Sequence, residues 1–128
     1  MTTRSKVLWA LQWFLGIFFT FTGVLHFVVP EGLPAAMGWM YELSDGLHLV
    51  TGVAEILGGI GLLLPALTKI KPILTSLAAD GLVLLMVGAI IWHAGRGETQ
   101  NIIQNTVLAG LLGFIAYGRW KLEPLPEK

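Results

Sequence analysis

Three residues whose types could do chemistry, His48, Thr51 and Glu55, are spaced three and four positions apart. In an α-helix this spacing places all three side chains on one face. Glu55 is the only charged residue in the apolar run from Gly46 to Leu67. With no basic residue at a matching depth, its carboxyl group in a membrane is protonated or hydrogen-bonded. Glu55 is therefore the best candidate for a ligand-binding or proton-transferring group, and a hydrogen bond that only fixes helix packing is the alternative.

The first apolar run carries a comparable stripe that ends in a second histidine. This stripe, with spacings of four and three, consists of Gln12, Gly16, Phe19, Gly23 and His26. Gly52 and Gly59 lie close to the face that carries His48, Thr51 and Glu55. Small residues of this kind allow helices to approach closely in lipid. If the two stripes face each other, His26, His48 and Glu55 meet in one pocket in the outer half of the membrane.

Further polar residues, from the same and from other apolar runs, extend this predicted ligand-binding pocket. Thr51 lies beside Glu55, Gln104 or Asn101 reaches the pocket from the fourth run, and His93 closes its rim. For the histidines the alternative is an interfacial position, where an amphipathic ring is stable. For the amide side chains the alternative is packing or helix capping.

Asp80 is a second carboxylate inside an apolar run. One hypothesis pairs it with Glu55 through a shared proton, so that the two relay protons, and the other places it in a separate cavity. At about 100° per residue, Asp80 lies roughly 140° around its helix from His93. These two residues therefore do not belong to one stripe.

Several kinds of site find no support in the sequence. The chain has no cysteine, which excludes thiolate catalysis, zinc thiolates and a redox dithiol. The three histidines come from different apolar runs, without H-x-x-x-H or E-x-x-H spacing. Neither a metal site nor a haem site is predicted, although a bis-histidine haem is geometrically conceivable. With no serine-hydrolase arrangement and no glycine-rich phosphate loop, no catalytic residue is predicted.

The composition indicates a membrane protein. Hydrophobic residues make up 55% of the 128 residues and charged residues 12%, whereas about 25% are charged in a soluble domain. Such an apolar chain does not stay solvated as a disordered coil. The eight basic and eight acidic residues balance, which argues against nucleic acid as a partner and leaves the lipid bilayer as the predicted environment.

Four apolar runs are long enough to cross a bilayer as helices, which takes roughly 17 to 25 residues. They cover residues 7–29, 46–67, 72–93 and 101–118. Open strands cannot span lipid, because their edges leave backbone groups unpaired. The sequence therefore predicts an all-α, polytopic four-helix bundle that forms one membrane domain over residues 1–128. The loop from Pro30 to Ser44 is predicted either to lie on the outer surface of the membrane or to cap the bundle, and Ser44 or Asp45 to cap the second helix.

The basic residues predict the orientation of the bundle. Seven of the eight fall on the side that holds both termini and the second loop, namely Arg4, Lys6, Lys69, Lys71, Arg119, Lys121 and Lys128. Arg96 alone falls on the opposite side. Because basic residues concentrate in cytoplasmic segments, both termini are predicted to be cytoplasmic in a plasma (inner) membrane.

Four segments of the chain resemble the DoxX-like family of small membrane proteins. They are the runs Gly23–Pro30, Thr51–Pro65, Ala78–Ile90 and Ala116–Trp120. The most specific part is the pattern Gly-x-x-Glu-x-x-Gly-Gly, which contains Glu55 as its acidic residue. The resemblance extends from about Gly16 to Trp120. Asp80 departs from it, because a small apolar residue is usual there.

The resemblance implies a four-helix membrane protein with a link to quinone or thiol redox chemistry. The family takes its name from a subunit of a thiosulfate-oxidising, quinone-reducing system, and other members are linked to thiol and oxidative-stress handling beside a partner protein. On this basis the chain is expected to be a redox accessory protein that binds a quinone-like or other small amphipathic molecule. Without a self-contained catalytic motif, it would be at most the membrane subunit of an oxidoreductase.

The sequence is also compatible with two other functions. Glycine-rich helix faces would also suit a structural or assembly subunit of a larger membrane complex, or a homo-oligomer. A small proton-coupled transporter would use Glu55 and Asp80 as its relay. Four helices leave little room for a pore, however, and no pair of broken helices indicates alternating access.

Overall fold

Four long α-helices make up most of the computed structural model, which describes residues 1–128. They are α1 (Thr3–Val28), α2 (Asp45–Thr68), α3 (Ile73–Gly95) and α4 (Thr99–Tyr117). A 3-10 helix, η1 (Ala35–Tyr41), and a π-helical turn, η2 (Gly118–Leu122), complete the fold, which has no strand. All four long helices are apolar and long enough to cross a membrane. The prediction of an all-helical bundle with four spans is confirmed.

Capping residues fix where the helices begin and end. The side chain of Thr2 accepts a hydrogen bond from the backbone N–H of Ser5, so α1 begins earlier than the apolar run predicts. Ser44 caps α2 in the same way, by accepting from the backbone N–H of Leu47. At the end of α1, Val29 adopts a left-handed conformation with φ 41°, and Pro30 follows it.

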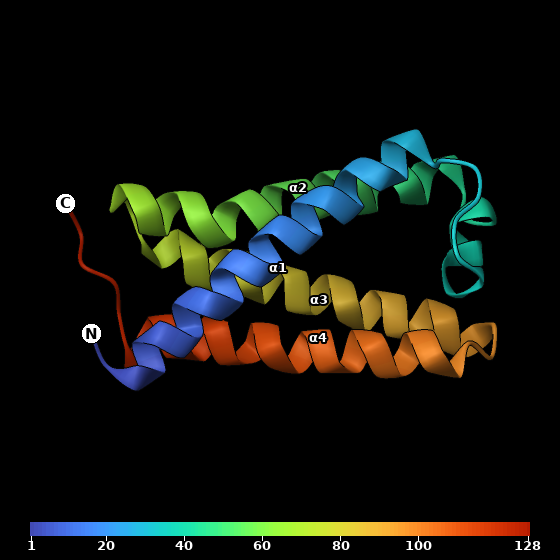
Figure 1. Cartoon of the computed structure of the whole chain (residues 1–128). Coiled ribbons are helices and arrows are strands. Elements are labelled where there is room, and N and C mark those ends of the chain that lie inside the picture. The colour runs from blue at the N-terminus through green and yellow to red at the C-terminus, as the bar shows by residue number, and fades with distance from the viewer.

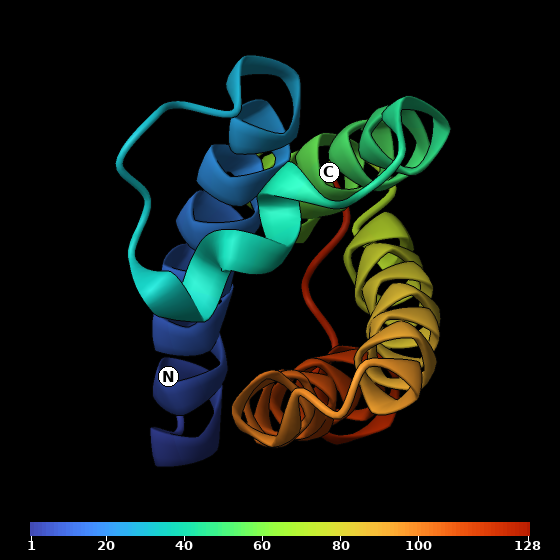
Figure 2. The same ribbon diagram turned by 90° about the vertical axis from the view of Figure 1, so that its right-hand side faces the viewer.

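The bundle has two distinct ends (Figure 1). Both termini and the turn between α2 and α3 lie at one end, which we call the terminal end. The helix η1 and the turn between α3 and α4 lie at the other, which we call the loop end. The capping segment predicted between the first two spans is present as η1, which crosses over the loop end (Figure 2). That the terminal end faces the cytoplasm stays a prediction.

Helix α1 lies obliquely across the other helices (Figure 1). It packs mainly on α2, while α2 packs on α3 and α3 on α4; α1 and α4 meet over a much smaller area. Seen from the loop end, the four helices form an open ring in which α1 and α4 are the two end members (Figure 2). The bundle is therefore tightest along α1 and α2 and loosest between α1 and α4.

Glycines allow the backbones of α1 and α2 to touch. A Cβ atom added to Gly59 would lie 2.7 Å from the carbonyl oxygen of Gly16 and 2.5 Å from Oγ1 of Thr20. One added to Gly23 would lie 2.9 Å from the carbonyl oxygen of Gly52. The stripes predicted on the first two helices therefore do face each other, in the close approach that small residues permit in lipid.

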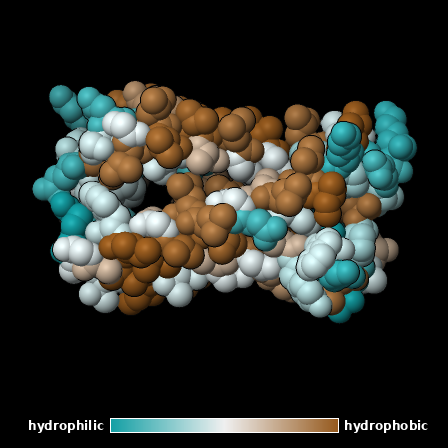
Figure 3. All heavy atoms as spheres, turned by 180° about the vertical axis from the view of Figure 1, so that it is seen from behind, coloured by the Kyte–Doolittle hydropathy of each residue, from teal (hydrophilic) through white to brown (hydrophobic).

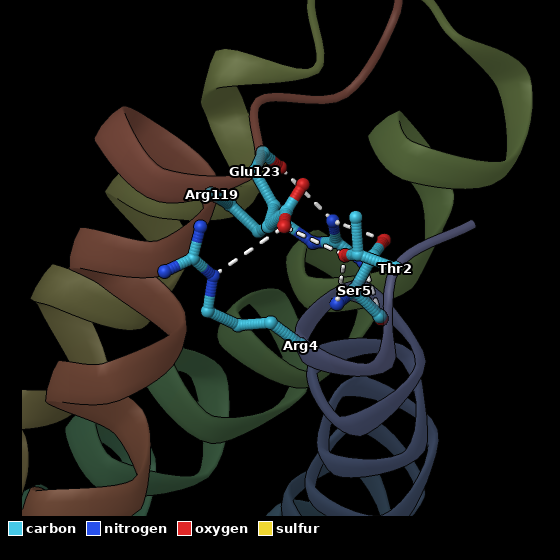
Figure 4. A network of polar contacts seen from close by, with 5 residues as sticks. All are labelled: Thr2, Arg4, Ser5, Arg119 and Glu123. Carbon is cyan, nitrogen blue, oxygen red and sulfur yellow. Dashed lines mark hydrogen bonds and ion pairs between the residues drawn. The ribbon is translucent and has the colours of Figure 1, made fainter.

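A buried arginine ties the two ends of the chain together at the terminal end (Figure 4). Arg119 donates hydrogen bonds to Oε1 of Gln12 (2.7 Å), Oγ of Ser5 (3.1 Å) and the carbonyl oxygen of Glu123 (2.9 Å). Gln12 in turn donates to the carbonyl oxygen of Leu62. The sequence indicates Arg119 only as a basic interfacial residue, whereas in the structure its charge is buried and fully engaged.

Glu123 completes this network from the exposed side. Its Oε1 accepts hydrogen bonds from the hydroxyl group of Thr2 (2.6 Å) and from Nε of Arg4 (3.4 Å). The hydrogen bond from Thr2, followed by that from Arg4, holds the pKa of Glu123 below its ordinary value. The start of α1 and the end of the chain are therefore joined by polar contacts (Figure 4).

The outside of the bundle suits a hydrocarbon environment. Large apolar side chains are exposed on all four long helices, among them Phe21, Leu57, Leu84 and Val107. In Figure 3, hydrophobic side chains cover most of the middle of the molecule and hydrophilic ones gather at its two ends. This distribution is typical of helices that span a bilayer.

We predict that the replacement Gly59→Ala destabilises the protein by about 1–3 kcal/mol, the usual range for overpacking a tight contact. The added methyl group meets backbone atoms of α1, which cannot move without separating the two helices. Gly110→Ala is the matched control, because a Cβ atom there meets nothing within 4 Å. Thermal unfolding in detergent measures the difference, and equal midpoints for the two variants would contradict the prediction.

Candidate functional site

A cavity of about 400 Å³ lies between the helices, toward the loop end. It exists because α1 diverges from α4 in this half of the bundle (Figure 1). Residues of η1 and of all four long helices line it, and most of them are hydrophobic. Its polar lining residues are Thr22, His26, Thr51, Glu55, His93, Asn101, Gln104 and Asn105. A mostly apolar cavity with a few polar groups is the usual form of a small-molecule site.

Glu55 is the central polar group of the cavity wall. Its Oε1 lies 3.1 Å from Nε2 of His26, and its Oε2 accepts a hydrogen bond of 2.8 Å from the hydroxyl group of Thr22. The carboxyl group is buried. The glycine contact between α1 and α2 holds the two backbones close together. Because the helices run in opposite directions, His26 and Glu55 lie on opposite sides of the Gly23–Gly52 contact, and their side chains, which lean toward the start of their own helices, meet across it.

His48 extends the same chain of contacts behind His26. Its Nδ1 lies 2.9 Å from Nδ1 of His26, and its Nε2 lies 2.8 Å from the carbonyl oxygen of Met40 in η1. A carbonyl oxygen only accepts, so Nε2 of His48 carries a proton. The orientation of His48 is therefore fixed by η1, and that of His26 is fixed by His48.

These contacts form a path along which one proton can move. Three arrangements satisfy every contact from the carbonyl oxygen of Met40 to Glu55. The movable proton lies on Glu55 when both rings are neutral, on His26 when that ring is a cation, or on His48 when that ring is a cation. Each arrangement interconverts with the next by a shift of hydrogen-bonded protons. The cavity wall can therefore give or take a proton at Glu55 or at Nε2 of His26.

Aromatic rings form the side of the cavity that faces the loop end. Trp39 of η1 lies with its ring centroid 5.1 Å from that of His93 and 5.9 Å from that of His26. Trp92 lies 6.2 Å from Trp39, edge to face. Edge-to-face contacts of this kind are favourable between aromatic rings. Trp39 thus covers the cavity between the two histidines.

Ion pairs join the loops around this aromatic cover. Oε1 of Glu98 lies 3.0 Å from Nδ1 of His93 and accepts a hydrogen bond of 2.8 Å from Nε of Arg96. Arg96 also pairs with Glu42, which follows η1, and lies over the ring of Trp92 at 4.7 Å. The segment that carries η1 is therefore fastened to the turn between α3 and α4. The hydrogen bond from His93, followed by the contact with Arg96, lowers the pKa of Glu98 below its ordinary value.

The sequence profile of the DoxX-like family matches residues 10–115. This chain belongs to the DoxX-like family. The match covers α2 and α3, most of α1 and α4, and every polar residue of the cavity, and it confirms the resemblance found in the sequence. Together with the four apolar helices it establishes an integral membrane protein. No curated protein and no solved structure matches the chain.

The fold of this DoxX-like protein brings most of the predicted site residues together. Glu55, His26, Thr51, His93 and Gln104 all line the cavity. His48 contacts His26, as its stripe predicts, but it does not line the cavity. It lies between His26 and η1, and reaches the cavity only through its contact with His26.

Asp80 is not brought to Glu55. It lies on the exposed surface of α3, outside the cavity, and the hydrogen bonds of Glu55 go to Thr22 and His26 instead. At about 1.5 Å per residue, Glu55 lies roughly 15 Å from the start of α2 at the loop end and Asp80 roughly 10 Å from the start of α3 at the terminal end. Differences in depth and in direction around the helix separate the two carboxyl groups, which corrects the hypothesis of a shared proton.

Two residues of the site, Thr22 and Trp39, are not predicted by the stripes of polar residues in the sequence. Thr22 is four residues before His26, a helical spacing that could have added it to the first stripe. Trp39 has no such signal, because its position depends on how η1 folds back over the bundle (Figure 2). Its partners in the site lie on α1 and α3, far from it in the sequence.

We predict that Glu98→Gln lowers the unfolding midpoint at neutral pH, and that its difference from the wild type shrinks in acid. The pKa of folded Glu98 lies below its ordinary value of 4.5. Its stabilising contribution is therefore complete above that pH and is lost as the pH falls through the lowered pKa. Thermal unfolding across a pH series measures the difference, with Glu31→Gln in the loop before η1 as control. A difference that does not change with pH would contradict the prediction.

Proposed function

We propose that this DoxX-like protein binds a quinone-like molecule in the cavity and exchanges a proton with it. The observation that carries the proposal is the hydrogen-bonded path through Glu55, which opens on an apolar cavity large enough for a small ring. A quinone ring is planar and apolar, and its carbonyl oxygens accept hydrogen bonds. When a quinone is reduced these oxygens take up protons, so a proton donor beside them is useful.

The polar groups of the cavity match a molecule with oxygens on two sides. Glu55 and His26 belong to the wall formed by α1 and α2, while Gln104 and two asparagines belong to the wall formed by α4. Aromatic residues also line the cavity, including Phe18 of α1 and Trp92 of α3. One carbonyl oxygen would accept from Glu55 or His26 and the other from an amide group of α4, with the ring among the aromatic side chains.

The electrons for such a reaction would come from a partner. The chain has no cysteine, so a thiol or sulfur donor would belong to another protein. We infer that the protein is the membrane subunit or accessory protein of a redox or oxidative-stress system. The loop end would face outward from the plasma membrane, since seven of the eight basic residues fall toward the opposite end.

Titration of the purified protein with a quinone analogue tests this function. Trp39 and Trp92 line the cavity, so we predict that a bound quinone quenches tryptophan fluorescence. Glu55→Ala removes the hydrogen-bonding group and should weaken binding about tenfold, as expected for loss of a hydrogen bond of about 1.5 kcal/mol. Asp80→Asn is the matched control, because it alters the other intramembrane carboxyl group, which lies outside the cavity. Unchanged fluorescence, or equal affinity of Glu55→Ala and the wild type, would count against the proposal.

A third variant separates binding from proton exchange. The amide of Glu55→Gln can donate to Nε2 of His26 and accept from Thr22, as a protonated Glu55 does, but it carries no acidic proton. We predict that Glu55→Gln binds the analogue within about threefold of the wild type, because the hydrogen bonds are kept. Infrared difference spectra recorded on quinone reduction should lose the carboxyl band of Glu55 in this variant and keep it in Asp80→Asn. Spectra identical to the wild type would remove Glu55 from the proton path.

A further inference from the structure

The cavity reaches the lipid-facing surface between α2 and α3. Five residues both line the cavity and are exposed on the outside of the bundle: Leu47 and Val50 of α2, Leu84 and Gly88 of α3, and Gln104 of α4. The four on α2 and α3 border the gap between those two helices, and the exposed fractions of Leu47, Val50 and Leu84 are 43%, 62% and 73%. Figure 3 shows a hollow on this side of the molecule, toward the loop end. We call this opening the α2–α3 mouth.

The mouth results from the way α2 and α3 diverge from their connecting turn (Figure 1). Near the turn the helices are in close contact, because a Cβ atom on Gly61 would lie 2.7 Å from Cβ of Ala78 and one on Gly58 would lie 2.6 Å from Cγ of Leu82. Farther from the turn the two helices lie apart (Figure 1), and residues of both, Val50 and Gly88 among them, line the cavity.

The chemistry of the mouth indicates what passes through it. Its residues are apolar or glycine, and at about 1.5 Å per residue Gly88 lies roughly 10 Å inside the loop-end limit of α3. That depth falls within the hydrocarbon layer, about 30 Å thick, of a bilayer. A polar, water-soluble molecule gains nothing from such a position. A hydrocarbon chain, in contrast, can lie with one part in the cavity and the rest among lipid tails.

We infer that the ligand of this cavity is a membrane-dissolved molecule with a long hydrocarbon tail, which leaves the protein through the α2–α3 mouth. The inference rests on the proposed function, which places the ring of the ligand beside Glu55. On α2, Val50 is exposed at the mouth, Thr51 is half-buried, and Glu55, one helical turn farther on, is buried; all three line the same cavity. Head group and tail would then occupy one continuous space.

The aromatic cover at the loop end supports this direction of exit. On that side Trp39 lies against His93 and Trp92, and Arg96 links Glu98 to Glu42. A tail directed there would have to displace these contacts and then enter water. The apolar mouth has no ion pair or hydrogen bond across it, so a tail can leave there without breaking a polar contact.

Two probes and two matched variants test the inference. The probes are 2,3-dimethoxy-5-methyl-1,4-benzoquinone, which has no tail, and the same ring with a decyl chain. Gly88→Trp fills the mouth, whereas Gly81→Trp places an equal side chain on the same helix, at an exposed glycine with equally open space that does not line the cavity. Affinities are measured by fluorescence quenching in one detergent. The affinity of each probe for a variant is compared only with the affinity of the same probe for the wild type, so that partition of the probe into micelles cancels.

We predict that Gly88→Trp weakens binding of the decyl probe about tenfold or more, because the tail loses its apolar contacts, and leaves the tail-free probe within about twofold of the wild type. Gly81→Trp should change neither affinity. Circular dichroism verifies folding, and Val50→Trp blocks the mouth from its other side if Gly88→Trp fails to fold.

Three outcomes would overturn the inference. In the first, Gly88→Trp leaves the affinity for the decyl probe unchanged, as expected if a phospholipid chain fills the mouth and the ligand tail does not. In the second, Gly88→Trp weakens binding of both probes equally, and in the third, Gly81→Trp has the same effect as Gly88→Trp.

A different result would overturn the proposed head-group position and keep the tail path. In that case Glu55→Ala leaves the affinity for the tail-free probe unchanged, while Gly88→Trp still weakens binding of the decyl probe. Failure of both probes to bind the wild type would overturn both proposals.

Discussion

The backbone contact between α1 and α2 determines where this bundle is tight and where it is open. The backbones of Gly16 and Gly59, and of Gly23 and Gly52, lie close together, and side chains such as Leu63 and Ile56 pack against these glycines. The two helices are therefore held at a fixed distance and angle. This contact sets the distance across which His26 and Glu55 meet, one on either side of Gly23 and Gly52. It also directs α1 obliquely away from α4 (Figure 1), and the cavity forms where the two diverge. Packing of small residues thus produces both the hydrogen-bonded path and the space beside it.

Polar groups inside lipid need partners, and the two ends of the bundle meet this requirement in different ways. At the terminal end, Arg119 and Gln12 bond to each other and to the carbonyl oxygens of Glu123 and Leu62, and the result is a fixed link between the chain ends. Toward the loop end, His26 and Glu55 also bond to each other, but their contact borders a cavity and leaves one proton free to shift. The first arrangement can only stabilise, whereas the second can exchange a proton with a bound molecule.

The sequence predicts those features that depend on spacing within one helix. Apolar run length predicts the four spans, and the three-and-four spacing correctly places Glu55 and His26 on facing stripes. Features that depend on relations between elements are not predictable in this way. Trp39 enters the site because η1 folds back over the bundle, and the same fold places His48 behind His26. The error about Asp80 has another cause, because the predicted starts of the second and third spans, residues 46 and 72, agree with the observed ones to within one residue. Which face of α3 turns outward, and therefore that Asp80 is exposed, depends on how α3 packs against its neighbours.

The contrast between the two sides of the cavity bears on how a ligand is exchanged. Toward water, aromatic contacts and ion pairs join η1 to the turn between α3 and α4, so opening there requires several polar contacts to break together. Toward lipid, α2 and α3 separate beyond Leu82 and only apolar side chains border the gap. A molecule that enters from the bilayer encounters no polar barrier before it reaches Glu55. The hydrogen-bonded path, by contrast, runs from Glu55 through the two histidines and ends at the carbonyl oxygen of Met40 in η1, which only accepts. A ligand would therefore enter the cavity from lipid, and the proton that it exchanges would be one already held by Glu55 and the two histidines.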